Sequence, residues 1–158
     1  MLYAILKTLH LLAIIVWIGG MVFAHFFLRP AVGALEPAVR VRLMHAVLGR
    51  FFGAVLVAIA VSLATGLWMI GRVAKQVVQA GGQFNMPLEW TIMATLGIVM
   101  MLTFGHIRFV LYKRLSRAAL ALDWPAGAAA MWQIRSWVLV NLALGVLIVL
   151  VTLIGVPR

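Results

Sequence analysis

The sequence contains no cysteine, and only 10% of its 158 residues are charged. Without cysteine there is no disulfide, no thiolate-bound metal or iron–sulfur cluster, and no covalent haem attachment through a Cys-x-x-Cys-His motif. There are only 3 acidic residues, which are too few for chemistry that depends on paired carboxylates. No Ser–His–Asp or nucleotide-binding pattern is found either. These absences exclude a disulfide scaffold and the common hydrolase classes.

Apolar residues are in excess and make up 66% of the chain. An ordinary soluble domain is about 45–50% apolar and about 25% charged. A soluble protein of this size could not bury so much apolar surface, because small domains have a high surface-to-volume ratio. We therefore expect the chain to lie in a lipid bilayer, which excludes a soluble enzyme and a disordered tail.

Four apolar stretches are each long enough to cross a bilayer as a tilted helix. They cover about residues 3–28, 50–71, 88–111 and 133–156 of one domain, 1–158. The runs are too long and continuous for barrel strands, and a backbone in lipid must satisfy its own hydrogen bonds. The predicted fold class is all-α, an integral membrane antiparallel four-helix bundle. Residues 36–49 form either a short amphipathic helix or an extension of the second span.

The charge is strongly of one sign, with 13 Lys and Arg against 3 Asp and Glu. In membrane proteins such cations gather in cytoplasmic loops, so the excess predicts orientation and no nucleic-acid partner. The first and third loops with their edges hold nine cations and the second loop holds two: Arg29, Arg40, Arg42, Arg50, Arg108, Lys113, Arg114, Arg117 and Arg135 against Arg72 and Lys75. We predict cytoplasmic first and third loops, with both termini on the outer side.

The four histidines are the best candidates for chemistry, because ionisable residues inside membrane spans are rarely without function. His10 and His25 are separated by about 22 Å along the first helix and by about 60° around it. Both therefore face the bundle, yet they cannot share one metal ion. His45 is expected at the cytoplasmic interface, in contact with solvent or headgroups.

His25 and His106 are expected at similar depths, about 33 Å and about 27 Å from the outer ends of their helices. Spans one and three are diagonal neighbours in an up-down bundle, so this pair could ligate a haem iron from both faces. Arg29, Arg108 and Arg135 lie near the same helix ends and could bind the haem propionates through their bidentate forks. The positive-inside rule alone would also supply most of these arginines.

Methionines offer a second chemistry. Met86, Met93 and Met100 recur every seven residues on the third span, and histidine with methionine suits copper, especially Cu(I). Such a stripe is also an ordinary helix-packing face. Because dense methionine clusters are absent, Met93 is the weakest of the candidate ligands.

Several short motifs resemble those of bacterial CopD-type membrane proteins. They are Lys7-Thr8-Leu9-His10, Trp17 with Gly19-Gly20, Phe23-Ala24-His25, Arg29-Pro30, Thr65-Gly66-Leu67-Trp68, Gly105-His106-Ile107-Arg108-Phe109, Ile134-Arg135 and Asn141-Leu142-Ala143-Leu144-Gly145. The resemblance covers nearly the whole chain and implies a copper-resistance D domain, implicated in copper uptake across the inner membrane. Lys7, His10 and Trp17 with a following glycine are also distantly similar to the HemJ-type protoporphyrinogen oxidase, a four-helix membrane protein that binds b-type haem. The oxidase activity does not carry over on so short a match.

Three functions stay open at this point. The one we favour is a b-type haem protein of the bacterial inner membrane, with His25 and His106 as axial ligands and His10 as an alternative ligand. It would exchange electrons with a quinone or a redox partner, or act on a porphyrin, as a membrane oxidoreductase. The second is a copper-handling protein in which His10 receives the ion and histidine and methionine relay it inward. The third is a cofactor-free assembly subunit, and a homo-oligomer is compatible with all three.

Overall fold

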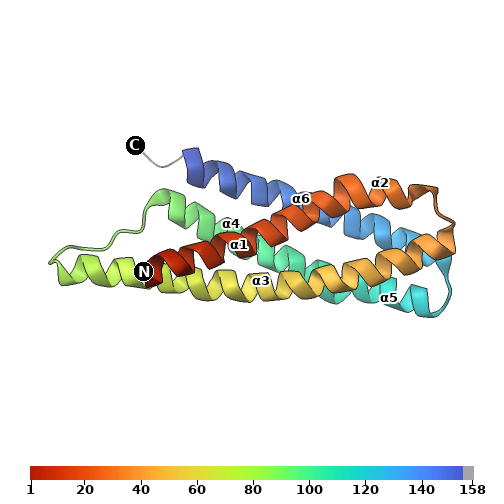
Figure 1. The fold of residues 1–158 in the computed structure, drawn as a ribbon, viewed down its shortest axis with the longest axis horizontal. Helices are drawn as coiled ribbons and strands as arrows, with labels where there is room; N and C mark the ends of the chain where they lie inside the picture. The colour runs from red at the N-terminus through yellow and green to blue at the C-terminus, as the bar shows by residue number, and fades with distance from the viewer. Residues whose placement is uncertain (155–158) are drawn as a thin grey trace.

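The computed structural model describes residues 1–154, which are almost entirely helical (Figure 1). The elements in chain order are α1 (Leu2–Val22), the π-helical η1 (Phe23–Leu28), α2 (Arg29–Ala31), the 3-10 turn η2 (Val32–Ala34), α3 (Pro37–Gln79), α4 (Leu88–His106), the π-helical η3 (Ile107–Leu111), α5 (Tyr112–Leu120) and α6 (Trp124–Ile154). These elements join into four helical segments that are long and apolar enough to cross a membrane. The all-α fold and the four spans are thus confirmed, while predicted span residues 155 and 156 lie outside the described residues.

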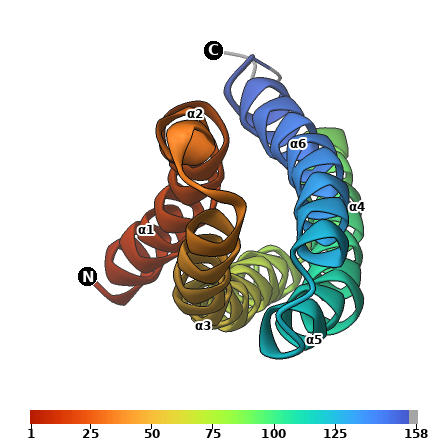
Figure 2. The ribbon, with the colours of Figure 1, turned by 90° about the vertical axis from the view of Figure 1, so that its right-hand side faces the viewer.

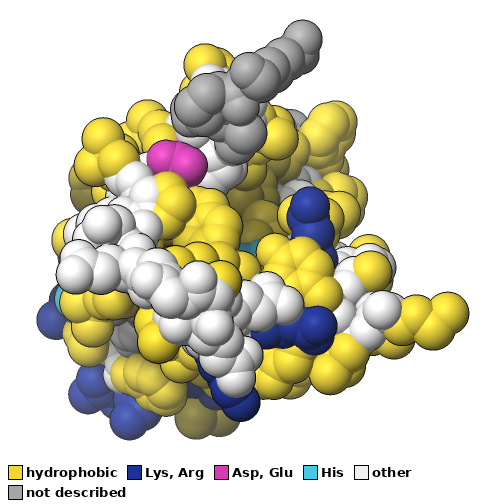
Figure 3. All heavy atoms as spheres, turned by 90° about the vertical axis from the view of Figure 1, so that its left-hand side faces the viewer, with side chains coloured by type: hydrophobic (Ala, Val, Ile, Leu, Met, Phe, Trp, Pro, Cys, Tyr) yellow, Lys and Arg dark blue, Asp and Glu magenta, His cyan; other side chains and the backbone are white. Residues whose placement is uncertain are grey.

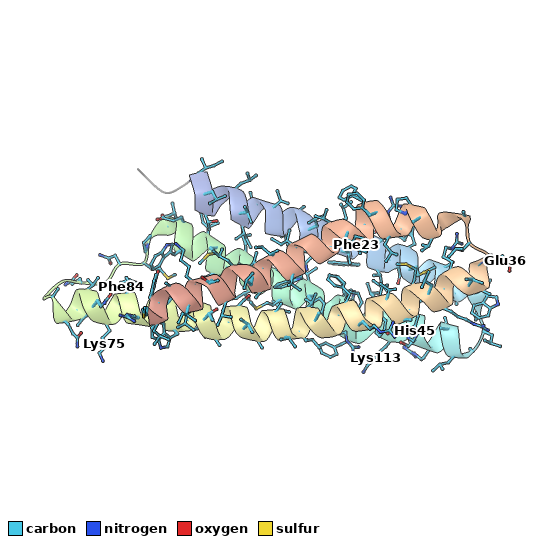
Figure 4. The ribbon with its side chains drawn as sticks, viewed as in Figure 1. Phe23, Glu36, His45, Lys75, Phe84 and Lys113 are labelled. Atoms are coloured by element: carbon cyan, nitrogen blue, oxygen red, sulfur yellow. The ribbon has the colours of Figure 1, made fainter. Side chains whose placement is uncertain are left out.

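The long helices run in alternating directions along the bundle (Figure 1). The helices α1 and α3 pack closely as one pair, and α4 and α5 pack on α6 as the other. We call the end that carries the turns at 35–36 and 121–123 the basic end; Figure 2 views the molecule from this side. Lys75 and Phe84 mark the opposite end (Figure 4).

The helices extend further toward the basic end than the hydropathy predicts. Residues 36–49 are the extension of the second span that was one of two alternatives, because α3 runs unbroken for 43 residues from Pro37. The predicted spans 88–111 and 133–156 leave residues 112–132 as a loop, and this expectation is wrong. Its first part is α5, an amphipathic helix that buries Leu115 and Ala118.

The Trp124-Pro125 pair begins a helix and does not break one. Proline is tolerated in the first turn, where its missing N–H would have no intrahelical partner. Asp123 completes this start, because its Oδ1 accepts a hydrogen bond of 2.9 Å from the Ala126 N–H. The loop between the last two spans therefore shrinks to residues 121–123.

Two of the helical segments contain a π-helical turn close to a histidine. The turn η1 includes His25, and η3 begins directly after His106. The first π turn precedes Pro30, which has no N–H to donate and would otherwise strain the helix. π turns inside α-helices occur frequently at functional sites. The turns beside His25 and His106 are therefore candidate parts of such a site.

Aromatic side chains fill the middle of the bundle. Trp17 packs edge-on against Phe104 with ring centroids 6.1 Å apart, and Phe52 packs edge-on against Phe104 at 5.7 Å and Tyr112 at 5.5 Å. We call these four side chains the aromatic layer. Trp17, Phe52 and Phe104 are buried, and the layer joins α1, α3 and α4 across the diagonal of the bundle.

The outer surface of the bundle is apolar. Only 17–28% of the most hydrophobic stretch of each span is buried within the chain. Leucine, valine, isoleucine and phenylalanine side chains point outward along all four spans, and hydrophobic side chains cover much of the surface in Figure 3. Such a surface is stable in lipid and not in water.

Candidate functional site

His10 is held by a hydrogen bond from a neighbouring helix. Its Nδ1 lies 2.9 Å from Oγ1 of Thr65 on α3. The Thr65 hydroxyl in turn donates to the Val61 carbonyl oxygen at 2.6 Å. A hydroxyl has a single proton. While Thr65 donates it to Val61, Thr65 accepts from the His10 ring, and this arrangement favours the tautomer with the hydrogen on Nδ1.

This hydrogen bond favours one tautomer of His10. With the proton on Nδ1, a neutral imidazole presents the lone pair of Nε2 to a ligand. Metal-binding histidines are commonly oriented in this way by a hydrogen bond at the other nitrogen. Gly66 lies directly beside the ring, since a Cβ at this position would be in ordinary contact with the His10 Cε1 at 3.4 Å.

A second candidate site is a cavity of about 280 Å³ at the basic end. Its polar lining consists of His25 from η1, Arg29 from α2, Arg40 from α3 and Arg135 from α6. We call it the basic pocket. The charges of Arg29 and Arg135 lie close enough to act on His25 and on each other. Met44, Met131 and Trp132 are among the remaining lining residues.

The structure does not bring His25 and His106 together as a ligand pair. The His106 side chain is exposed, and its ring lies 5.1 Å from that of Trp137. His25 lines the basic pocket beside Arg135. Positions 135 and 137 are about 200° apart around α6, so the two histidines approach this helix from different sides.

The other predicted site residues are spread over the bundle. Arg108 lies over the Phe109 and Tyr112 rings, with its Cζ 5.8 and 5.1 Å from their centroids, and it does not line the basic pocket. Met93 is half-buried on α4. His45 joins two helices, because its ring stacks on Tyr112 and its Nε2 lies 2.9 Å from the Ser116 Oγ on α5. The ring is partly exposed, and its expected contact with solvent or headgroups stays a prediction.

Several buried polar atoms near the bundle centre have no hydrogen-bond partner. Asn141 on α6 is fully buried, and both atoms of its amide are unpaired, as is the indole nitrogen of Trp17. Ser62, one turn before Thr65 on α3, also has an unpaired buried hydroxyl. Buried groups of this kind usually bond to internal water or to a ligand.

Sequence reasoning found His10, His25, Arg29 and Arg135 but missed their partners. Arg40 and Met44 lie in residues 36–49, whose structure the sequence left open between two alternatives. Their position next to His25 therefore could not be predicted. The signal for Thr65 was present, because Thr65-Gly66 is one of the short motifs that carry the family resemblance. Nothing in the sequence pairs Thr65 with His10 without the packing of α1 on α3.

The four spans and the apolar exterior define a multi-pass helical membrane protein. A comparison with protein families matches residues 45–154 to copper resistance protein D (CopD). This range is more than two thirds of the chain, and the protein therefore belongs to the CopD family. The range includes Thr65, His106 and Arg135, whereas His10 and His25 precede it. Comparisons with curated proteins and with solved structures give no match.

Proposed function

We propose that this CopD-family protein binds and moves copper ions in the membrane, with His10 as a ligand near the end opposite the basic end. The observation that carries the proposal is the hydrogen bond between Nδ1 of His10 and Oγ1 of Thr65, which favours the tautomer whose Nε2 lone pair can bind a ligand. The name of the family, copper resistance protein D, identifies copper as the cargo to test.

The donor atoms in this region suit Cu(I) best. Within residues 1–154 no group of three His, Cys, Asp or Glu side chains could hold a metal ion. Copper would therefore be bound by few ligands, and thioether sulfur and imidazole nitrogen are those that favour Cu(I). Met69 follows Thr65 by four residues, which places a thioether on the same face of α3. We infer that His10 and Met69 share the ion.

The experiment is a Cu(I) titration of the purified protein against a colorimetric competitor. We expect His10→Ala to abolish binding at this site, and Thr65→Val to weaken it by about 10–100-fold, as loss of the hydrogen bond that orients a metal ligand does. Thr91→Val is the matched control, because Thr91 donates only along its own helix to the Pro87 carbonyl. Unchanged Cu(I) affinity in His10→Ala contradicts the proposal.

Haem is the second candidate, since the free Nε2 of His10 would also suit a haem iron. It has less support, because His25 and His106 lie on different sides of α6. The absorbance spectrum of the purified protein separates the two functions. If the wild type shows a Soret band that His10→Ala lacks, the bound group is haem and not copper. The metal at His10 would then be iron.

We also propose that the basic end faces the cytoplasm of a bacterial cell, with the protein in the inner membrane. Nine cations near this end support the orientation through the positive-inside rule. His10 would then receive copper from the outer side, and the basic pocket would open on the inner side.

A further inference from the structure

The basic pocket collects positive charge from three separate parts of the chain. Arg29, Arg40 and Arg135 come from α2, α3 and α6, which surround this end of the bundle in Figure 2. The guanidinium groups of Arg40 and Arg135 are close enough to repel that of Arg29. Bringing like charges together at the edge of a low-dielectric bilayer is unfavourable unless an anion lies between them.

No carboxylate lines this pocket in the described part of the chain. Asp123 caps the N-terminus of α6 through the Ala126 N–H. Glu36 is exposed at the tip of the basic end (Figure 4). The positive charge of the pocket is therefore available to an anionic ligand, and the same charge disfavours a free copper cation.

The rest of the pocket wall is apolar, and this favours anions that carry an apolar part. Val32, Ile134 and Val138 are buried side chains of this wall. Trp132 also lines the pocket and is 63% exposed, as expected of an aromatic residue at a membrane interface. An anionic head with an apolar body fits such a wall better than a small hydrated ion.

We propose that the basic pocket is a phosphate-binding site, and that the phosphate is the headgroup of an anionic phospholipid. Arginine forks bind phosphate oxygens bidentately. Arg29 and Arg135 contact the phosphate from opposite walls. Arg40, which already donates to the Gly33 carbonyl at 3.4 Å, joins them from α3. The acyl chains lie along the apolar exterior of the bundle.

The test is native mass spectrometry of the purified protein in a neutral detergent. The probes are dioctanoyl-phosphatidylglycerol, dioctanoyl-phosphatidylcholine and sodium phosphate. We expect the wild type to retain phosphatidylglycerol in preference to phosphatidylcholine. Arg29→Gln and Arg135→Gln each weaken this binding by about tenfold or more, because each removes a charge-assisted contact. Arg29→Lys has a smaller effect, since it keeps the charge but loses the fork.

Arg117→Gln is the matched control, because Arg117 is an exposed cation of the basic end that does not line the pocket. It removes the same charge and should leave lipid binding unchanged, and the melting temperature without lipid verifies that each variant folds. Equal losses in Arg117→Gln and Arg29→Gln overturn the proposal in favour of general charge attraction. Binding of sodium phosphate but not of phosphatidylglycerol overturns the lipid assignment. His10→Ala should retain lipid, which keeps this result separate from the copper proposal.

Discussion

Asn141 is fully buried on α6, and neither its Oδ1 nor its Nδ2 has a hydrogen-bond partner. A buried amide without a protein partner costs free energy unless internal water or a ligand satisfies it. If it has only a packing role, it destabilises the bundle. If it serves the passage of a polar cargo, it is retained in spite of that cost.

Asn141→Leu tests these roles. We expect the free energy of unfolding to rise by about 1–3 kcal/mol, because an unpaired amide is replaced by an apolar group of similar size. Thermal unfolding in detergent measures it, and copper accumulation in cells reports any loss of transport. Asn141→Ala is the comparison that removes the amide but leaves a cavity. A lower stability in Asn141→Leu would mean that internal water or a ligand satisfies the amide in the native protein.

At single positions the sequence was a poor guide both to depth along a helix and to direction around it. His106 was expected near the inner end of its span and pointing inward, but the helix continues to Leu120, so His106 lies near the middle of the segment, and its side chain is exposed. The buried stripe of this segment runs through Met100, Phe104, Ile107 and Leu111, and His106 lies beside it. Because span three is apolar on every side, its composition does not distinguish the face toward the bundle from the face toward lipid.

Close packing between elements depends on small residues. A Cβ at Gly145 on α6 would lie 3.1 Å from the Ile18 Cδ1 and 3.2 Å from the Met100 Cε. The glycine therefore lets α6 approach α1 and α4 at once. Helix association in lipid depends on such contacts, because the hydrophobic effect between helices is weak there.

Gly145→Val is expected to destabilise the bundle by about 1–3 kcal/mol, because the added methyl groups overpack a filled contact. Gly97→Val on α4 is the matched control, since a Cβ there meets nothing within 4 Å. The melting temperatures of both variants in detergent check the prediction. Equal melting temperatures would mean that Ile18 and Met100 simply move aside.

The helices themselves were predictable, but their ends were not. Hydropathy locates the part of a helix that lies in lipid, and the four apolar runs were found for this reason. It gives no signal where a helix continues into water, as in residues 37–49 and in α5. In those segments the amphipathic spacing of residues such as Leu115 and Ala118 indicated a helix. The many charged residues lowered the hydropathy there and hid this pattern.

For the whole molecule, helix length and charge together support the proposed orientation. The 43 residues of α3 span about 64 Å, roughly twice the hydrocarbon thickness of about 30 Å. The helix must therefore project beyond the lipid. The projecting part at the basic end includes Arg40 and Arg42, which suits the cytoplasmic face.

Single cysteines test this orientation directly, because the natural chain has none. Gln83→Cys and Glu36→Cys introduce exposed thiols near the two opposite ends. In intact cells, a membrane-impermeant maleimide should label Gln83→Cys and reach Glu36→Cys only after the membrane is opened. The wild-type chain, which cannot react, is the control. The reverse labelling pattern contradicts the proposed orientation.

The aromatic layer has a kinetic consequence. Trp17, Phe52 and Phe104 are at most 5% exposed and meet edge to face between the level of His10 and the basic pocket. Under the proposed function, an ion that crosses through the bundle has to displace these rings, so each crossing is tied to a rearrangement of packed side chains. The expected behaviour is that of a carrier, with a turnover that saturates as external copper rises and depends steeply on temperature, and not the sustained ion current of an open channel.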